Sequence, residues 1–161
     1  MKTSCKEPVF NPEHDFENIE IDVRQLFPNA KVFEKAVTEM SIQQSRRVKL
    51  IKNDKRRVRY VCKYDIKCPW YVYASVMDDE IGFQVRTMNK THNCPVSFTN
   101  KQVTAKWCAS KYQEKWKNQP NWNITSFAKQ LRDDTCVDVS RWTFYRARRF
   151  ASRALRGDAK E

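Results

Sequence analysis

Glycine is scarce in this chain, with only two in 161 residues. A glycine-rich loop that cradles phosphates needs several glycines at fixed spacing, so this means of binding nucleotides is excluded. Histidine is equally rare, and His14 and His92 lie far apart in the sequence. The acidic pairs Asp78-Asp79 and Asp133-Asp134 fall in predicted turns, where solvated side chains are expected. The sequence therefore offers no catalytic constellation.

Long apolar runs are also missing. No stretch approaches the roughly 20 apolar residues of a membrane-spanning helix. Residues 1–10 lack the apolar core of a secretory signal. We therefore expect no membrane partner and a nuclear or cytosolic location, where thiols stay reduced. The nucleus is the predicted compartment, because the charge favours a nucleic-acid partner.

Positive charge is the main compositional feature, with 31 Lys and Arg against 19 Asp and Glu and a formal net charge of +12. Residues 1–30 are acidic, with three basic and six acidic side chains. Residues 31–100 hold fourteen basic against seven acidic, and residues 101–161 hold fourteen against six. This balance suits a polyanion, and nucleic acid rather than membrane, because no amphipathic stretch carries a large apolar face.

Four possible metal donors form a Cys-x5-Cys-x23-His-x-Cys array: Cys62, Cys68, His92 and Cys94. Three thiolates and an imidazole are a donor set that one structural Zn²⁺ takes as a closed tetrahedral site, with no open position for water activation. Disulfides are the alternative in a secreted protein, but a reduced compartment favours metal. The remaining cysteines have no neighbouring histidine. We interpret Cys108 and Cys136 as small buried side chains and Cys5 as part of a tail.

The periodicity of apolar residues changes along the first hundred positions. Residues 1–25 are acidic without clear periodicity, and we predict a flexible arm. A helix follows over residues 30–40, started by Pro28 or Asn29. Alternating patterns then predict four antiparallel strands, over residues 46–52, 57–62, 69–77 and 83–88. The predicted fold class is α+β, with a small four-stranded zinc-bound sheet in a domain of residues 26–100.

Helical periodicity returns after residue 100. One helix is capped by Thr104 and ends near residues 118–120, a second covers residues 126–132, and a third covers residues 141–156 between Ser140 and Gly157. Three helices with short turns and a basic last helix are typical of a helix-turn-helix module. We predict this module over residues 101–157, followed by a tail over 158–161.

The third helix carries six arginines: Arg141, Arg146, Arg148, Arg149, Arg153 and Arg156. A solvated helix face is the alternative to a nucleic-acid contact. The side chains expected to point inward are Phe144, Ala147, Ala151 and Ala154 or Leu155. Trp142 and Tyr145 are predicted to anchor the helix rather than to stack on bases.

Each of the two regions contains its own set of short motifs. The first contains Phe33–Ala36, Lys52–Lys55, Val58–Cys62, Cys68–Trp70, Ala74-Ser75, Phe83–Val85 and His92–Cys94. The second contains Ala105–Trp107, Val139–Arg141 and Tyr145–Arg149. Together these motifs resemble the N-terminal DNA-binding part of plant Mutator-like (MuDR) transposases, over most of residues 26–156.

The resemblance implies that the first domain is WRKY-like and similar to the glial-cells-missing (GCM) zinc domains. Those are four-stranded sheets that present one strand edge to the DNA major groove. It places residues 46–52 where the WRKY reading strand lies. This segment, RRVKLIK, departs from the WRKYGQK heptad, so the WRKY target sequence cannot be transferred.

We therefore predict a zinc-stabilised protein that binds double-stranded DNA, with the terminal inverted repeats of a transposon as the target that the resemblance suggests. The predicted contacts are Arg46, Arg47, Lys49, Lys52, Lys55, Arg56, Arg57, Arg59, Arg141, Arg146, Arg148, Arg149 and Arg153. Full-length members of the family continue into a catalytic transposase core. The present chain stops at Glu161 before such a core, so we expect no enzymatic activity.

Other interpretations remain open. The chain could act as a transposase-derived transcription regulator adopted by its host, or as a protein-interaction adaptor without catalysis. RNA binding is a third hypothesis, since basic charge alone does not choose a polymer. A homodimer, or fusion to a transposase catalytic domain, is compatible with each of them.

Overall fold

The computed structural model describes residues 8–64, 67–79 and 82–158. The chain divides into two compact units, which we call the sheet unit (Met1–Pro95) and the helical unit (Val96–Glu161). The division lies five residues before the predicted boundary. Each unit has buried apolar residues of its own.

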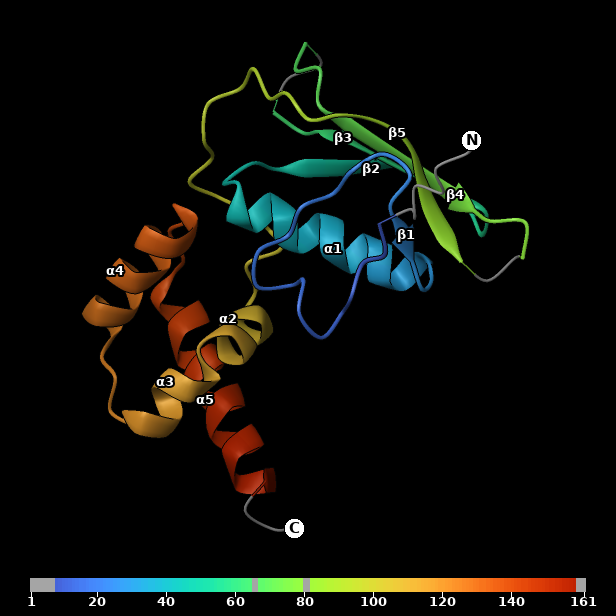
Figure 1. The fold of residues 1–161 in the computed structure, drawn as a ribbon. Helices are drawn as coiled ribbons and strands as arrows, with labels where there is room; N and C mark the ends of the chain where they lie inside the picture. The colour runs from blue at the N-terminus through green and yellow to red at the C-terminus, as the bar shows by residue number, and fades with distance from the viewer. Residues whose placement is uncertain (1–7, 65–66, 80–81, 159–161) are drawn as a thin grey trace. The chain divides into compact units, whose positions relative to one another are not determined.

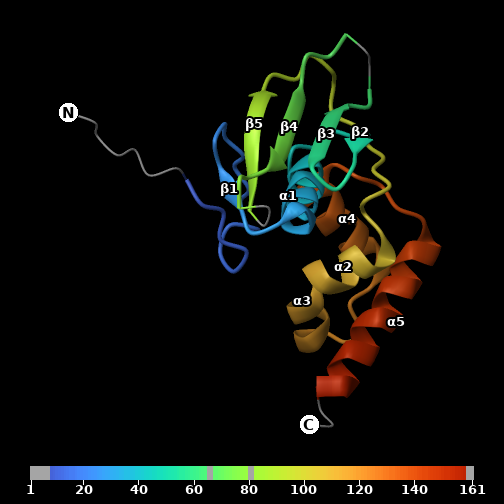
Figure 2. The same ribbon diagram turned by 90° about the vertical axis from the view of Figure 1, so that its right-hand side faces the viewer.

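The sheet unit contains five antiparallel strands in the order β1-β5-β4-β3-β2, which can be followed in Figure 2. They are β1 (Leu26–Phe27), β2 (Val48–Asn53), β3 (Arg57–Cys62), β4 (Tyr71–Val76) and β5 (Phe83–Asn89). The four longer strands correspond to the four predicted ones. The prediction of four strands was wrong because β1, which pairs with β5, has only two residues. Two residues are too short to show a period of two.

Helix α1 (Ala30–Gln43) covers one face of this sheet (Figure 1). The Asn29 side chain caps its first turn by accepting a hydrogen bond from the Val32 N–H at 2.9 Å. The buried side of α1 presents Phe33, Ala36, Val37 and Met40 to the core. Alternate strand residues meet them there: Val58, Tyr60, Val72, Ala74, Phe83 and Val85. The helix therefore supports one side of the sheet, and the strands' other side chains point away from it.

The segment before β1 is packed, and the prediction of a flexible arm over residues 1–25 was wrong from Pro8 onward. Phe10, Ile19 and Ile21 are buried in the core. The Phe10 N–H donates to the Leu26 carbonyl at 2.8 Å, and its ring stacks on Phe27 with centroids 4.9 Å apart. These apolar residues are too far apart in an acidic segment to form a period, so only the tertiary contacts reveal them. Residues 1–7 of the predicted arm lie outside the described residues.

The helical unit contains four described helices instead of the predicted three. They are α2 (Ala105–Lys111), α3 (Gln113–Asn118), α4 (Ile124–Thr135) and α5 (Arg141–Asp158). The first predicted helix breaks at Tyr112, whose φ of −108° and ψ of 22° are not helical. The turn predicted at Asp133-Asp134 begins later, because α4 continues to Thr135 and ends at Cys136 in the left-handed conformation. Gly157 lies in the last turn of α5 rather than beyond its end.

Aromatic side chains dominate the core of the helical unit. Trp116 lies 5.1 Å from Trp122 and 5.6 Å from Phe127 between ring centroids, and Phe127 lies 5.1 Å from Phe144. Helix α5 packs against α2, α3 and α4. Burial of several large rings, at roughly 1.5–3 kcal/mol for a fully buried apolar side chain, gives this small unit its cohesion without a metal. Among the described helices, none is both long and apolar enough to cross a membrane.

Candidate metal centre and basic surfaces

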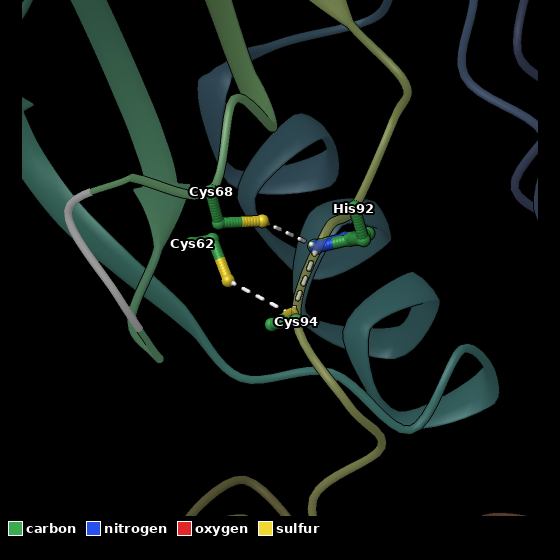
Figure 3. A group of neighbouring side chains, drawn as sticks. All are labelled: Cys62, Cys68, His92 and Cys94. Carbon is green, nitrogen blue, oxygen red and sulfur yellow. Dashed lines mark hydrogen bonds between the residues drawn. The ribbon is translucent and has the colours of Figure 1, made fainter.

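The four predicted donors come together where strands β3, β4 and β5 meet their loops. Cys62 is the last residue of β3, Cys68 precedes β4, and His92 and Cys94 follow β5. Neighbouring strands of an antiparallel sheet bring these ends to one place. Figure 3 shows the four side chains pointing toward one another. We call them the Cys/His cluster.

The distances within the cluster fit a tetrahedral metal ion. The Sγ atoms of Cys62 and Cys94 are 3.5 Å apart. The His92 Nδ1 atom lies 3.6 Å from both Cys68 Sγ and Cys94 Sγ, and all four donor atoms lie within 4.8 Å of one another. A tetrahedral zinc ion separates its sulfur ligands by about 3.8 Å and sulfur from nitrogen by about 3.6 Å, given bond lengths of about 2.3 and 2.0 Å. The cluster could therefore bind one metal ion.

The imidazole of His92 is held in the orientation and charge state that a metal requires. Its ring stacks on the buried Trp70, with centroids 5.1 Å apart and an interplanar angle of 9°. Burial and the nearby positive charge of Arg46 lower the pKa of His92 to about 4. The ring is thus neutral at physiological pH, the form that donates a lone pair to a metal.

The thiols of the cluster differ in acidity. Burial, followed by the neighbouring thiols, raises the pKa of Cys62 to about 12. Burial also acts to raise the pKa of Cys68, but backbone N–H groups, led by those of Trp70 and Asn93, outweigh it and lower that pKa to about 7. The Asn93 N–H donates to Cys68 Sγ at 3.3 Å. A thiol that accepts backbone hydrogen bonds is prepared to act as a thiolate ligand.

The other cysteines stay outside the cluster. Cys108 is fully buried in the helical unit, and burial raises its pKa to about 12, consistent with an inert core residue. Cys136 is half-buried, so its predicted burial is only partial, because it occupies the left-handed position at the end of α4. Cys5 lies outside the described residues.

The first basic surface is formed by β2, β3 and the segment between them, together with the two residues before β2. We call it the basic hairpin. It contains eight of the predicted DNA contacts and one acidic residue, Asp54. The exposed members are Lys49, Lys52, Lys55, Arg56 and Arg57, and the half-buried ones are Arg46, Arg47 and Arg59. The structure therefore gathers residues 46–59 into one continuous basic element.

Two features shape the basic hairpin. The Asp54 carboxylate accepts the N–H groups of Arg56 and Arg57, both at 2.8 Å, which fixes the turn. These backbone hydrogen bonds lower the pKa of Asp54, and the bond from Arg56 has the largest effect. Burial acts in the opposite direction but does not outweigh them. The pairing of β2 with β3 slips by one residue at Ile51, between Leu50 and Lys52. Such a bulge bends an edge strand and redirects its side chains.

The sequence reasoning did not predict that Leu50 and Ile51 would be exposed. Their side chains are 38% and 50% exposed, although an alternating pattern suggested that the apolar residues of this strand face the core. Strand β2 is an edge strand, and five of its six residues are exposed. The charged residues around Leu50 and Ile51 are the signal in the sequence that this strand lies at an edge.

The second basic surface lies along α5, whose six arginines are all exposed. Phe144, Ala147 and Ala151 are buried as predicted, Leu155 is half-buried and Ala154 is exposed. The prediction that Trp142 and Tyr145 anchor the helix was wrong, because these side chains are 71% and 41% exposed. They lie on the arginine side of α5, because the buried stripe of this helix is narrow.

These features define an α+β protein with a Cys3His cluster that could hold a metal ion, an edge-strand basic hairpin and a basic helix. Residues 18–85 match the family model of the MuDR family transposase, which confirms the resemblance drawn from the sequence for that part of the chain. The matched region includes α1, the basic hairpin, Cys62 and Cys68, and ends before His92 and Cys94.

One similar solved structure is described as "Crystal structure of AFT2 in complex with DNA". It shares 15% identity with this chain at a TM-score of 0.39, and the alignment covers 71% of this chain and 88% of that one. No curated protein matches this chain.

Proposed function

We propose that this chain is a zinc-stabilised double-stranded DNA-binding protein that recognises the terminal inverted repeats of a transposon. The observation that carries the proposal is the basic hairpin, whose edge strand β2 is exposed and whose positions 46–59 hold eight basic residues and one acidic residue. The match of residues 18–85 to MuDR family transposases supports the choice of target. Activity in DNA transposition would then need a catalytic region in addition to the DNA-binding residues proposed here.

The dimensions of the basic hairpin suit the DNA major groove. The groove is about 12 Å wide and admits a two-stranded β-ribbon, whose strands lie about 4.8 Å apart. Lys49 and Lys52 are exposed on β2, and Lys55 and Arg56 lie at the turn. In this arrangement the basic side chains contact phosphates, and the side chains at the groove floor contact base edges. The exposed apolar side chains of Leu50 and Ile51 lie on the same strand. They would contact the bases rather than the phosphates.

The role of zinc in this proposal is structural. The ion would join the ends of β3, β4 and β5 through Cys62, Cys68, His92 and Cys94, and so hold the register of the strands that carry the basic hairpin. Four protein ligands complete a tetrahedron and leave no position for a reacting water. This is the WRKY-like and GCM-like arrangement that the sequence resemblance implies.

The helical unit would add contacts from α5. Helices α4 and α5 pack against each other and are joined by residues 136–140, which is compatible with a helix-turn-helix pair in which α5 is the second helix. Its arginines would neutralise further phosphates. A location in the nucleus follows from this function. A homodimer would place two such modules on the two ends of an element, and a fusion would join the module to a catalytic domain.

Competition binding tests the proposal directly. The chain is mixed with labelled duplex carrying a terminal inverted repeat, and scrambled duplex, duplex RNA and single strands are added as competitors. We expect the repeat to compete best, by at least about tenfold over scrambled duplex at physiological salt. Equal competition by duplex RNA and scrambled DNA would leave a non-selective polyanion binder and contradict the proposal.

The α5 contribution is tested with the double substitution Arg149→Ala/Arg153→Ala. Each lost phosphate contact lowers the slope of log K against log salt by about 0.9, so the duplex-binding slope should fall by about 1.8. Both arginines are exposed, so the fold should be retained. The matched control is Lys117→Ala/Lys129→Ala on α3 and α4, which removes the same charge. A slope equal to that of the control would remove α5 from the duplex interface.

Zinc binding should depend on pH. The Cys62 thiol, with a pKa near 12, carries a proton at neutral pH that zinc must displace, and Cys68, with a pKa near 7, carries one in part. His92, with a pKa near 4, releases none above about pH 5. With at least one proton released per ion, affinity for zinc should fall by at least about tenfold between about pH 7.5 and pH 6.5. Competition with a zinc indicator at each pH measures this, and a pH-independent affinity would argue against thiolate ligands.

A further inference from the structure

Helix α5 exposes two neighbouring aromatic side chains that no part of the proposed duplex contact uses. Trp142 is the most exposed of the large hydrophobic residues in the described chain, at 71%, and Tyr145 is 41% exposed. Their ring centroids lie 6.5 Å apart at an interplanar angle of 62°. One turn of helix separates them, so both rings project from the same side of α5. Contiguous exposed apolar rings mark a binding surface more often than solvated structure.

Arginines continue this side of the helix. Together with Trp142 and Tyr145, the residues Arg146, Arg149, Arg153 and Arg156 line one shallow hollow, which we call the α5 patch. Apart from the adjacent Tyr145 and Arg146, successive members are three or four residues apart, and at about 1.5 Å per residue the patch is about 21 Å long. The opposite stripe, with Phe144, Ala147 and Ala151, is buried in the core.

The charge of the α5 patch is uncompensated. No acidic residue occurs between Arg141 and Gly157. Within the described ranges, the ion pair of the helical unit joins Arg132 to Asp138, and none involves an arginine of the patch. Arg148 also lines this hollow and lies over the Tyr145 ring at 5.4 Å. The surface therefore combines two exposed aromatic rings with a row of exposed arginines that make no described ion pair.

We propose that the α5 patch is a binding site for single-stranded nucleic acid, in which Trp142 and Tyr145 stack on unpaired bases while Arg146, Arg149 and Arg153 contact the phosphates. Aromatic rings beside a positively charged track are the recurring design of sites for single strands. The distance of about 16 Å from Trp142 to Arg153 spans about five nucleotides at the rise of stacked bases, about 3.4 Å each. The arginines are those proposed above to contact duplex phosphates, so the two aromatic rings are what distinguishes the single-strand site; the proposal does not depend on duplex binding by the basic hairpin.

The aromatic pair favours unpaired bases over the two alternatives. In a duplex the faces of the bases are already stacked, so only their polar edges and the phosphates meet a helix, and arginines alone can serve that contact. A membrane-surface helix needs a broad apolar face. The α5 patch has only two aromatic rings among its arginines. Of the other large apolar residues of this helix, Phe144 is buried and Phe150 and Leu155 are half-buried, so no broad apolar face is exposed.

The test compares the full chain with two double variants. Trp142→Ala/Tyr145→Ala removes the rings, and Trp142→Phe/Tyr145→Phe keeps aromatic faces at both positions. Binding is measured by fluorescence anisotropy with labelled oligo(dT), oligo(U) and a duplex, each over a series of salt concentrations, and by sedimentation with vesicles that contain phosphatidylserine. The control Phe98→Ala removes another exposed aromatic ring of the helical unit, which is 60% exposed.

The alanine variant should bind single strands at least about tenfold more weakly, because stacking is worth about 1–3 kcal/mol per base. Its salt slope should be unchanged, because no charge is lost, and the phenylalanine variant and Phe98→Ala should stay close to the parent. Duplex affinity should also be unchanged. Oligo(dT) and oligo(U) reveal whether the site prefers DNA or RNA. Unchanged single-strand binding, an equal loss on duplex, or a loss on the vesicles alone would overturn the proposal.

Discussion

Replacing Cys68 by alanine is expected to abolish metal binding and to unfold the sheet unit. The Cys/His cluster joins the ends of three strands, and the donor distances leave room for a single ion between them. Structural zinc sites contribute about 10–16 kcal/mol of apparent binding free energy in small domains, which is comparable to the whole stability of a folded domain. Losing one of four ligands removes most of that contribution from a unit whose core surrounds the site.

The measurement is zinc content per chain, together with far-ultraviolet circular dichroism during thermal unfolding. Cys108→Ala is the matched control, because Cys108 is also buried but lies in the helical unit outside the Cys/His cluster. This control should keep one zinc per chain. In Cys68→Ala the helical signal of α2–α5 should persist, because the helical unit has a core of its own. A folded sheet unit in Cys68→Ala with full duplex affinity would contradict the structural role of the metal.

The double substitution Lys49→Ala/Lys52→Ala should weaken duplex binding by about tenfold and lower its salt slope by about 1.8. Both lysines are exposed on the edge strand β2, so their removal should leave the fold intact. Each phosphate contact contributes about 0.9 to the slope, and about 0.7 kcal/mol per contact gives the tenfold change. Binding isotherms at several salt concentrations supply both quantities.

Lys31→Ala/Lys35→Ala is the control for that experiment. It removes two exposed lysines from α1 in the same unit, with the same change in net charge. If duplex binding responds only to the total charge, the two variants will lose affinity equally, and β2 will have no special place in the interface. A loss confined to Lys49 and Lys52 would locate the duplex on the basic hairpin.

The sequence was most informative where metal-binding residue types cluster and where a periodic pattern extends over six residues or more. Cysteine and histidine are scarce enough that their spacing predicted the cluster of Cys62, Cys68, His92 and Cys94, and the structure brings their donor atoms within 4.8 Å of one another. Alternation over six residues or more predicted β2 to β5, since a strand with one buried face must alternate. The basic hairpin followed from these strands, because its residues are consecutive in the chain.

The remaining features depend on tertiary contacts that a local pattern does not contain. Phe10, Ile19 and Ile21 are isolated apolar residues, and only their packing against the sheet shows that the segment before β1 is ordered. Trp142 and Tyr145 are exposed because only a narrow stripe of α5 packs against the other helices. Helical periodicity alone places an aromatic residue toward the core, and here that inference failed. Because Trp142 and Tyr145 are exposed instead of buried, the α5 patch is a surface whose function can be tested.

In the proposed function the sheet unit and the helical unit would be stabilised in different ways. In that proposal the sheet unit would depend on a metal to hold a sheet whose edge strand faces solvent, while the helical unit has a core of packed aromatic rings. An edge strand is open to pairing and distortion unless its neighbours are held in place. A metal at the strand ends holds them without covering the basic hairpin. A strand that contacts base edges in the major groove must be held rigidly and must be accessible. The metal would supply the rigidity, and the exposed basic edge supplies the access.

The most direct test of this account is the zinc content of the purified chain, followed by chelation while the β-sheet signal and duplex binding are recorded together. The account predicts one zinc per chain and a simultaneous loss of sheet structure and duplex affinity when the metal is removed, with both restored by added zinc. A chain that contains no zinc, yet keeps its sheet and binds duplex DNA, would contradict it.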